Sequence, residues 1–293
     1  MTSNSTPPSC RVCEGLTLDF QYEVKACKIV KCNLCGLTQV SGSPAAEDLH
    51  SLYGESYFNR GKYVEDKAQD REQARRLKLL QSCGIPRNAR ILDGGCATGG
   101  FIKAASNYYE MWGIDISPYA ISQAKLDNPK CADRISAGLI EDQNFPNNHF
   151  DAIVFWDVIE HLDQPVEVIR NLIKFLKPQG YFILSTPNIS APIAKLMGKR
   201  WAFMTPPEHL CLFNSETIRL LMSKAGLDVK IWMSKGKWVN LGFFLYKLNK
   251  VFPGLLPANL IDLIRNSRVS SQLFYVPTGD IQYVASRLDE RLV

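Results

Sequence analysis

The sequence predicts an α/β fold in which helices cover both faces of a mostly parallel, seven-stranded sheet, preceded by a small metal-binding head. Apolar segments of strand length alternate with helical stretches over most of the chain, as is typical of parallel sheets. Two C-x2-C pairs precede that alternation. The chain has 293 residues, of which 46% are hydrophobic and 22% charged, as in a globular domain with a small appendage.

The predicted head carries two cysteine pairs, Cys10 with Cys13 and Cys32 with Cys35, separated by eighteen residues. This spacing is typical of a four-thiolate Zn²⁺ site without an open coordination position, so we expect a structural metal. The runs FQYEV and KIV between the pairs predict a hairpin, and Gly36 suits a turn with positive φ. We assign residues 1–42 to a zinc-ribbon-like head and residues 43–293 to the main domain.

Three alternatives remain for this head: unrelated buried cysteines, a rubredoxin-like iron site and a nucleic-acid-binding ribbon. The span 10–40 has four basic residues: Arg11, Lys25, Lys28 and Lys31. It lacks the dense basic face that phosphate contacts require, so we expect no nucleic-acid partner.

The elements of the main domain follow in order. Residues 62–82 are rich in helix formers and predict a helix that ends before Gly84. Strands are predicted at ARIL, YEMWGI, FDAIVFW and GYFILS, with helices between them over 100–107, 119–128 and 165–176. A further helix is expected to begin with Ser215 as its cap and to end at Gly226. The runs DVKIWM and IQYVAS predict two more strands.

The stretch ILDGGCATGG, residues 91–100, places four glycines directly after the first of these strands. Ligands of such sheets bind beyond the carboxyl ends of the strands, so we expect this loop to face a ligand. A dinucleotide favours G-x-G-x-x-G, but this loop has alanine at the second glycine. Asp115, at the end of the next strand, suits the ribose hydroxyls of any adenosine cofactor.

The pattern Asp93-x-Gly95-x-Ala97-x-Gly99 resembles motif I of the class I S-adenosylmethionine-dependent methyltransferases, with Ala97 in place of the usual middle glycine. GLIEDQNFPNNHFDAIVFWDVIEHL resembles the adenine-binding turn and fourth strand of that family. FILSTPN and PPEHLCLFNSETIRLLMSKAGL are similar to its small-molecule, glycan or quinone branches. The resemblance covers roughly residues 65–230 and implies a Rossmann-like fold that binds S-adenosylmethionine.

The resemblance also implies roles for individual residues. Asp93 would fix the amino group of the cofactor, Asp115 its ribose, and Glu141 or Asp142 would lie near the adenine amino group. The residues expected to bind the cofactor are Asp93, Gly95, Cys96, Ala97, Gly99, Asp115, Ile116, Leu139, Ile140, Glu141 and Asp157. For Asp157, the alternative is a structural role or a place in the polar lining of the pocket.

Methyl transfer to an alcohol or phenol needs a proton acceptor, and histidine suits this near neutral pH. Of the four histidines, His50 has no motif around it and His149 lies in a polar turn. His161 follows the fourth strand, and His209 lies in TPPEHL beside Glu208. We predict His209 as the base with Glu208 orienting it. His161 is the alternative base, and a packing role is the alternative for each histidine.

Two segments are expected to cover the site: a lid at about 189–214 and a C-terminal helical insertion at about 238–275. Both mix apolar and basic residues, and the chain from Lys195 onward has fourteen Lys and Arg against seven Asp and Glu. Such segments suit an anionic or lipid-linked acceptor and peripheral membrane contact, with an ordinary packed insertion as the alternative.

The sequence therefore predicts a methyltransferase acting on a small molecule or saccharide, by O-methylation of a glycan, lipid-linked or quinone-like acceptor. The first alternative is C-methylation of a nucleotide-linked deoxysugar, because such enzymes resemble this chain in carrying a zinc-bearing head. The second is a non-catalytic cofactor-binding scaffold whose head recruits partners or nucleic acid. We see neither a secretory signal nor a spanning apolar run in the sequence and expect a cytoplasmic protein.

Overall fold

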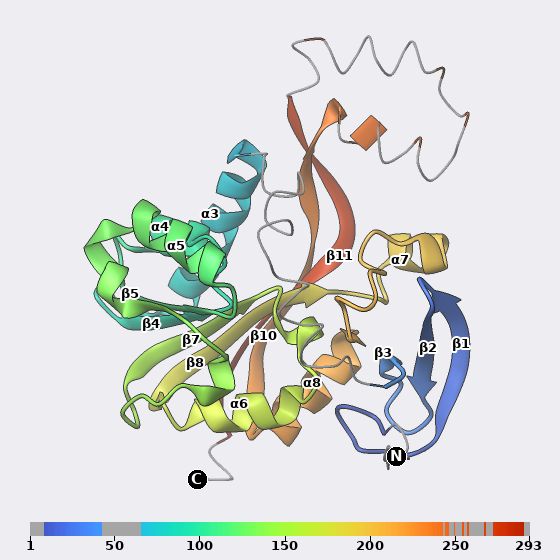
Figure 1. Ribbon diagram of the computed structural model, residues 1–293, viewed down its shortest axis with the longest axis horizontal. Helices are drawn as coiled ribbons and strands as arrows, with labels where there is room; N and C mark the ends of the chain where they lie inside the picture. The colour runs from blue at the N-terminus through green and yellow to red at the C-terminus, as the bar shows by residue number, and fades with distance from the viewer. Residues whose placement is uncertain are drawn as a thin grey trace.

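The protein was analysed as a computed structural model that describes residues 9–42, 66–242 and 272–289, together with six positions between 243 and 271. Its central sheet has seven strands in the order β10-β11-β8-β7-β4-β5-β6 (Figure 1). These strands are β4 (Arg90–Gly94), β5 (Glu110–Asp115), β6 (Ile135–Ala137), β7 (Phe150–Trp156), β8 (Leu176–Pro187), β10 (Leu227–Asn240) and β11 (Leu273–Leu288). Strand β11 is antiparallel to both of its neighbours, and the pairs from β8 to β6 are parallel.

The order of the strands places the candidate site. The chain runs outward from β4 to β6 and then returns to β7 on the other side of β4. The order therefore reverses between β4 and β7, and ligands of such sheets bind beyond the carboxyl ends of the strands at this point. The loops after Gly94 and Trp156 both start at this edge.

Alternate residues of the central strands pack into two separate cores. Leu92, Ile153 and Phe155 belong to one core, whereas Ile91 and Val154 belong to the other. Because side chains of a strand alternate between faces, both faces of the sheet are buried, as expected for a parallel sheet.

Helices cover the two faces. The second core includes residues of α3 (Asp66–Ser82), α4 (Gly100–Ala105) and α5 (Pro118–Asp127). The first core includes α6 (Pro165–Ile173) and α8 (Ser215–Lys224). Shorter elements are α7 (Pro192–Met197), η1 (Pro129–Arg134), η2 (Ile140–Asp142), η3 (Ile159–His161) and η4 (Gly198–Arg200).

The cysteine-rich head forms a second sheet. Strands β1 (Leu18–Val24) and β2 (Cys27–Cys32) make the predicted hairpin, and β2 pairs with β3 (Thr38–Val40). Strand β3 in turn pairs with β9 (Cys211–Leu212), which belongs to the main domain. Figure 1 shows the head beside α7 and α8, on the side of the molecule away from α4 and α5.

The structure differs from the sequence expectations in three places. The cap of α8 is Asn214, whose side chain accepts from the N–H groups of Glu216 and Thr217, so the prediction of Ser215 was wrong by one residue. The sequence analysis did not name β6 or the β3–β9 pairing. The C-terminal insertion was placed at 238–275, but β10 extends to Asn240 and β11 begins at Leu273, and most of the intervening chain lies outside the described residues.

Candidate active site

The loop after β4 has an unusual backbone. Gly95, Ala97 and Gly99 have φ values of 75°, 48° and 78°, and Ala97 is the one among them that carries a side chain. A Cβ atom on Gly95 would lie 2.4 Å from Cγ2 of Val158, and one on Gly99 would lie 2.6 Å from Nδ2 of Asn128. Glycine is therefore required at 95 and 99 by the protein's own packing, and these glycines alone do not identify a ligand.

Two carboxylates flank this loop. Asp115 ends β5 and accepts hydrogen bonds from the backbone N–H groups of Ala97 (2.8 Å) and Ser117 (2.9 Å). Each of its oxygens has one such partner, which leaves capacity for one further donor at each oxygen. Burial raises the pKa of Asp115 above its ordinary value, and the two N–H groups oppose that shift. The geometry fits the expected contact with two ribose hydroxyls.

Asp93 is the penultimate residue of β4 and is 1% exposed. Burial raises its pKa to about 8, although the nearby Arg76 guanidinium opposes the shift. Its Oδ1 and the Nε of Arg76 are both buried without a hydrogen-bond partner among the described residues. The Asp93 oxygen could accept from an ammonium group, and the Arg76 Nε could donate to a carboxylate. The methionine part of S-adenosylmethionine carries both groups.

Arg76 also fixes the end of β7. Its Nη2 donates to Oδ2 of Asp157 at 2.7 Å, and the hydroxyl of Ser185 donates to Oδ1 of the same carboxylate at 3.0 Å. Asp157 has a φ of 59°, a value rare for residues other than glycine, and these two bonds hold it there. Asp157 was expected among the cofactor ligands, with a structural or polar lining role as the alternative; these contacts favour the structural role, and its contact with the cofactor stays a prediction.

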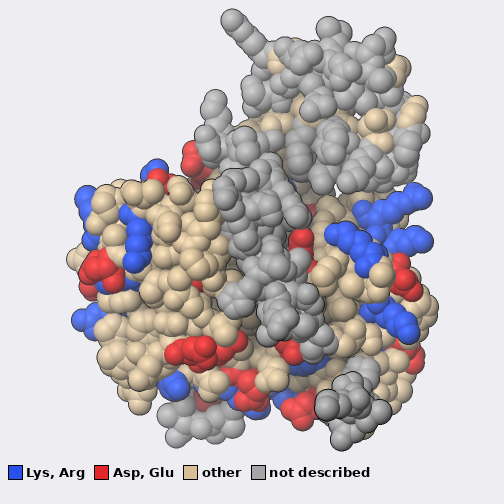
Figure 2. Space-filling model, in the orientation of Figure 1, with Lys and Arg blue, Asp and Glu red and all other residues tan. Residues whose placement is uncertain are grey.

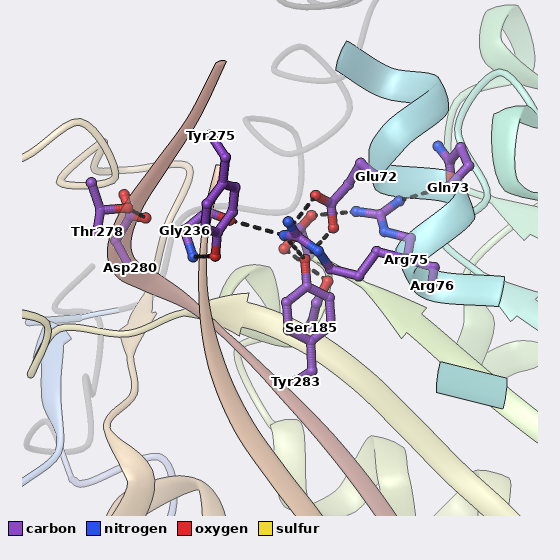
Figure 3. Close-up of polar contacts among 11 residues, drawn as sticks. Glu72, Gln73, Arg75, Arg76, Ser185, Gly236, Tyr275, Thr278, Asp280 and Tyr283 are labelled. Carbon is purple, nitrogen blue, oxygen red and sulfur yellow. Dashed lines mark hydrogen bonds and ion pairs between the residues drawn. The ribbon is translucent and has the colours of Figure 1, made fainter. Parts of the chain in front are cut away.

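A second network on α3 lies beside the first. Arg75 donates to Glu72 (3.1 Å), to the carbonyl of Gly236 (2.9 Å) and to the hydroxyl of Tyr283 (3.3 Å). Figure 3 shows Arg75 and Arg76 extending from α3 toward Tyr283 and Ser185 of the sheet. The network joins α3 to β10 and β11, so the helix that supplies Arg76 is held against the sheet.

The expected adenine segment lies on the same edge of the sheet. Ile140 is buried, and its Cδ1 would lie 3.4 Å from a Cβ atom on Gly94. Leu139, Glu141 and Asp142 are exposed, and Ile116 is half-buried. Cys96 is 5% exposed and packs in the core beside Gly113, so its backbone alone can meet a ligand. The cofactor assignments of these residues remain predictions.

The two candidate bases, His161 and His209, lie side by side in the structure. The rings of His161 and His209 lie 4.8 Å apart between centroids, at 82° to each other. Nδ1 of His161 is 2.7 Å from the carbonyl oxygen of Glu208, and Nδ1 of His209 is 2.8 Å from that of Phe203. Because a carbonyl accepts only, both Nδ1 atoms must carry the hydrogen, and the lone pair of each neutral ring is on Nε2.

Glu160 completes this cluster, in which it, His161 and His209 each offer one atom within 4.8 Å of the others. Its Oε2 accepts from the hydroxyl of Thr186 at 2.8 Å, and its Oε1 is buried without a hydrogen-bond partner among the described residues. Burial, with the nearby charge of Asp157, raises the pKa of Glu160. A carboxyl group and two imidazoles that lie this close together favour a shared proton or a bound divalent cation.

Lys237 lies against the predicted lid at about 189–214. The Nζ of Lys237, on β10, is 3.7 Å from the ring centroid of Phe203, whose carbonyl holds His209. Burial lowers the pKa of Lys237, and the charges of Asp280 and Asp157 oppose the shift. The segment between α7 and β9 also contains Trp201 Nε1 and Thr205 Oγ1, two buried polar atoms without partners among the described residues.

The four head cysteines lie together, as predicted. Sγ of Cys10 is 3.5 Å from that of Cys35, and the sulfurs of Cys13 and Cys32 are also 3.5 Å apart. A tetrahedral ion with Zn–S bonds of about 2.3 Å needs sulfurs roughly 3.8 Å apart, so these thiols fit zinc closely. All four are free thiols in the structure.

Arg76, Glu160 and Lys237 were not among the residues predicted from the sequence. Arg76 is one of several charged residues in a helix, and its ion-pair partner Asp157 is 81 positions away in sequence. Glu160 adjoins the predicted His161, and an acidic residue beside a candidate base was the one signal that could have identified it. His50 lies outside the described residues.

Comparison with known proteins agrees with this geometry. Residues 66–230, more than half of the chain, match the family described as a methyltransferase domain. The chain belongs to this family. Among solved structures, the YcgJ protein of Bacillus subtilis covers 74% of this chain and 99% of its own at a TM-score of 0.55 and 15% identity. Magnesium protoporphyrin IX methyltransferase of Synechocystis PCC 6803, solved with bound SAH, covers 83% and 99% at a TM-score of 0.54 and 12% identity. These similarities show the fold.

Curated relatives include enzymes of quinone biosynthesis. The mitochondrial ubiquinone biosynthesis O-methyltransferase of Candida albicans is 29% identical over 133 residues, which are 43% of this chain and 39% of that protein. The ubiquinone/menaquinone biosynthesis C-methyltransferase of Pseudomonas putida (strain W619) is 27% identical over 177 residues, 56% of this chain and 68% of that protein. The chain spans 39% and 49% of the length of the first two relatives.

Proposed function

We propose that this protein transfers a methyl group from S-adenosylmethionine to a small-molecule acceptor. One observation carries the proposal: Oδ1 of Asp93, near the carboxyl end of β4, and Nε of Arg76 are both buried without a hydrogen-bond partner among the described residues, and the Arg76 guanidinium is close enough to oppose the rise in the pKa of Asp93. This pair is matched to an amino-acid zwitterion, and the family membership of residues 66–230 supports the same cofactor.

Bound S-adenosylmethionine would supply the methyl group on a sulfonium. Asp93 and Arg76 would hold its methionine end, Asp115 would accept from the ribose hydroxyls, and Leu139 with Ile140 would flank the adenine. Such placement matters because displacement at a methyl group needs the acceptor in line with the leaving sulfur.

His209 would accept the acceptor's proton. The Phe203 carbonyl holds Nδ1–H of that ring, so Nε2 has the lone pair a base needs, and the same holds for His161 with the Glu208 carbonyl. Glu208 thus acts on His161 through its backbone. The carboxylate of Glu160 would stabilise the charged ring that forms after proton transfer.

We propose O-methylation of a quinone-like, glycan or lipid-linked acceptor, supported by the relatives of quinone biosynthesis and by the surface beside the site. Lys195, Lys199 and Arg200 are exposed on α7 and η4 beside Leu196, which is 78% exposed. Figure 2 shows Lys and Arg side chains gathered on this side of the molecule. No helix among the described residues is long and apolar enough to span a membrane.

The experiment is incubation of the full chain with S-adenosylmethionine labelled on the methyl group and with fractions of a cell extract. We expect label in an organic-soluble or saccharide fraction, dependent on active protein. Label in a nucleotide-linked sugar at carbon would instead support C-methylation, the second candidate, which the zinc-type head favours. Tight cofactor binding without transfer to any fraction would support the scaffold alternative.

A further inference from the structure

The four-cysteine head is joined to the candidate site by a continuous chain of contacts. Strand β3 of the head pairs with β9, with Gln39 opposite Cys211 and Thr38 opposite Leu212. Beyond that pairing, the N–H of Val40 donates to the carbonyl of Leu210 at 2.9 Å. Leu210 directly follows His209, so the head reaches the residue next to the predicted base.

Leu210 also joins the two histidine segments. Its N–H donates to the carbonyl of Glu160 at 2.8 Å, and the carbonyl of Glu208 accepts from His161 at 2.7 Å. The regular structure at both segments is short: His161 ends η3, a 3₁₀ turn of three residues, and His209 lies two residues before β9, a strand of two residues. Their positions must therefore be set by what they contact.

A second connection starts inside the first cysteine pair. The Nε of Arg11, which lies between Cys10 and Cys13, donates to Oδ1 of Asp163 at 3.0 Å, and its side chain is 6% exposed. Asp163 lies two residues after His161. The other end of the guanidinium donates to the carbonyls of Val40 and Gly42. Arg11 therefore connects the first cysteine pair both to the end of β3 and to the residues that follow η3.

The head also shares a core with the main domain. Cys10, Val12 and Leu37 belong to the same hydrophobic cluster as Cys211 and Phe213, and Gln39 is 1% exposed. Gln39 accepts from the N–H of Arg11 at 3.0 Å and donates to the carbonyl of Ser9 at 2.9 Å. Gln39 of β3 thus holds the first cysteine pair in the position in which Arg11 contacts Asp163.

We propose that the zinc-binding head is a positioning element of the active site, in which Arg11 and β3 hold the segments of His161 and His209 in register. The inference rests on the proposed function for its catalytic consequence, but the positioning itself is a property of this chain. Arg11 is a positioning residue, because it acts on His161 through Asp163.

The test uses the full chain with ¹⁵N-labelled histidine and follows the ring nitrogens by NMR. The variants are Arg11→Met, Arg11→Lys and Asp163→Asn, together with zinc-depleted parent protein. Lys28→Met is the matched control, because it removes an exposed cation of the head on β2, away from the contacts with β9. His149, which packs against Trp112 and Phe150, is the internal control. His161→Gln and His209→Gln assign the signals.

We expect Arg11→Met, Asp163→Asn and zinc depletion to shift the ring signals of His161 and His209 and to leave those of His149 in place. Arg11→Lys should restore the parent signals in part, and Lys28→Met should match the parent. Turnover should fall roughly tenfold in Arg11→Met, as expected for about 1.4 kcal/mol of lost positioning, while the affinity for S-adenosylmethionine stays near that of the parent.

Unchanged His161 and His209 signals in folded Arg11→Met and in zinc-depleted protein would overturn the inference. If Arg11→Met gives no cooperative thermal unfolding, Asp163→Asn decides, since it breaks the same ion pair from outside the head. A parent protein that fails to bind S-adenosylmethionine would refute the proposed function, whereas the histidine signals would still decide the positioning.

Discussion

The imidazole rings of His161 and His209 lie 4.8 Å apart between centroids and nearly perpendicular, although 48 positions separate them in sequence. Each ring has its Nδ1 against a backbone carbonyl, which fixes the tautomer with the lone pair on Nε2. Both imidazoles thus have the same tautomer and lie beside the carboxylate of Glu160. Together the three groups form a site that can accept a proton.

The first prediction separates the roles of these two rings. His209→Ala should lower the rate of methyl transfer by about 10²–10⁴-fold, the usual cost of losing a general base, while cofactor affinity stays near that of the parent. His149→Ala is the control for losing a histidine elsewhere. A larger loss in His161→Ala than in His209→Ala would assign the base to His161. Restoration of activity by added Fe²⁺ after chelation would instead favour a cation held by the cluster, because two imidazoles and one carboxylate suit that ion.

The second prediction concerns Asp93 and pH. Burial raises its pKa from the ordinary 3.8 to about 8, so between these values the folded protein holds a proton that the unfolded chain has lost. This residue therefore lowers the free energy of unfolding as pH rises through that window. An ammonium group prefers the ionised carboxylate, so cofactor affinity should rise with pH up to about 8 and binding should release a proton.

Calorimetry in two buffers of different ionisation enthalpy measures that proton. Asp93→Asn should bind S-adenosylmethionine more weakly and with little change between pH 6 and pH 8, a range set by the window above. Equal pH dependence in parent and variant would show that another group causes it.

The third prediction concerns the metal. Freshly purified protein should contain about one zinc ion per chain, because Cys10, Cys13, Cys32 and Cys35 form one tetrahedral set. Since the head packs in the same core as β9, chelation should also lower the melting temperature of the main domain. Elemental analysis that finds iron would favour the rubredoxin-like alternative, and analysis without bound metal would contradict the site.

The fourth prediction uses the backbone of the candidate cofactor loop. Ala97 has a φ of 48°, a conformation that costs a residue with a Cβ atom roughly 1–2 kcal/mol. Ala97→Gly should therefore raise the free energy of unfolding by about 1 kcal/mol or less, after the greater freedom of glycine in the unfolded chain is subtracted. Urea denaturation measures this. A destabilised variant would mean that the methyl group of Ala97 makes contacts worth more than the strain.

Much of the fold was predictable because it depends on local patterns. The strands β4, β7 and β8 each contain a short, mostly apolar run, and α5 and α6 lie between them in sequence as the alternation predicted. Strand β6 has three residues, two of them exposed, and offers no such pattern. The cap of α8 was misplaced because Asn214 and Ser215 are adjacent residues that both cap helices well.

The site was predictable where a motif carries it. Spacing alone grouped the four cysteines, the resemblance to motif I indicated Asp93, and the position at the end of the next strand indicated Asp115. Arg76 and Lys237 reach the site from α3 and β10, and only the packing of those elements brings them there. The strand pairing between head and main domain involves β9, a strand of two residues that no periodicity can indicate.

The assignment of S-adenosylmethionine as the cofactor is tested most directly by calorimetric titration of the full chain with S-adenosylmethionine and, separately, with NADH. We predict one site per chain for S-adenosylmethionine, none for NADH, and weaker binding in Asp115→Ala by roughly 1.5–3 kcal/mol, because one carboxylate serves two hydroxyls. Asp127→Ala, which removes an exposed carboxylate at the end of α5, should bind like the parent. Tight binding of NADH, or equal affinity for S-adenosylmethionine in the parent and Asp115→Ala, would contradict the assignment.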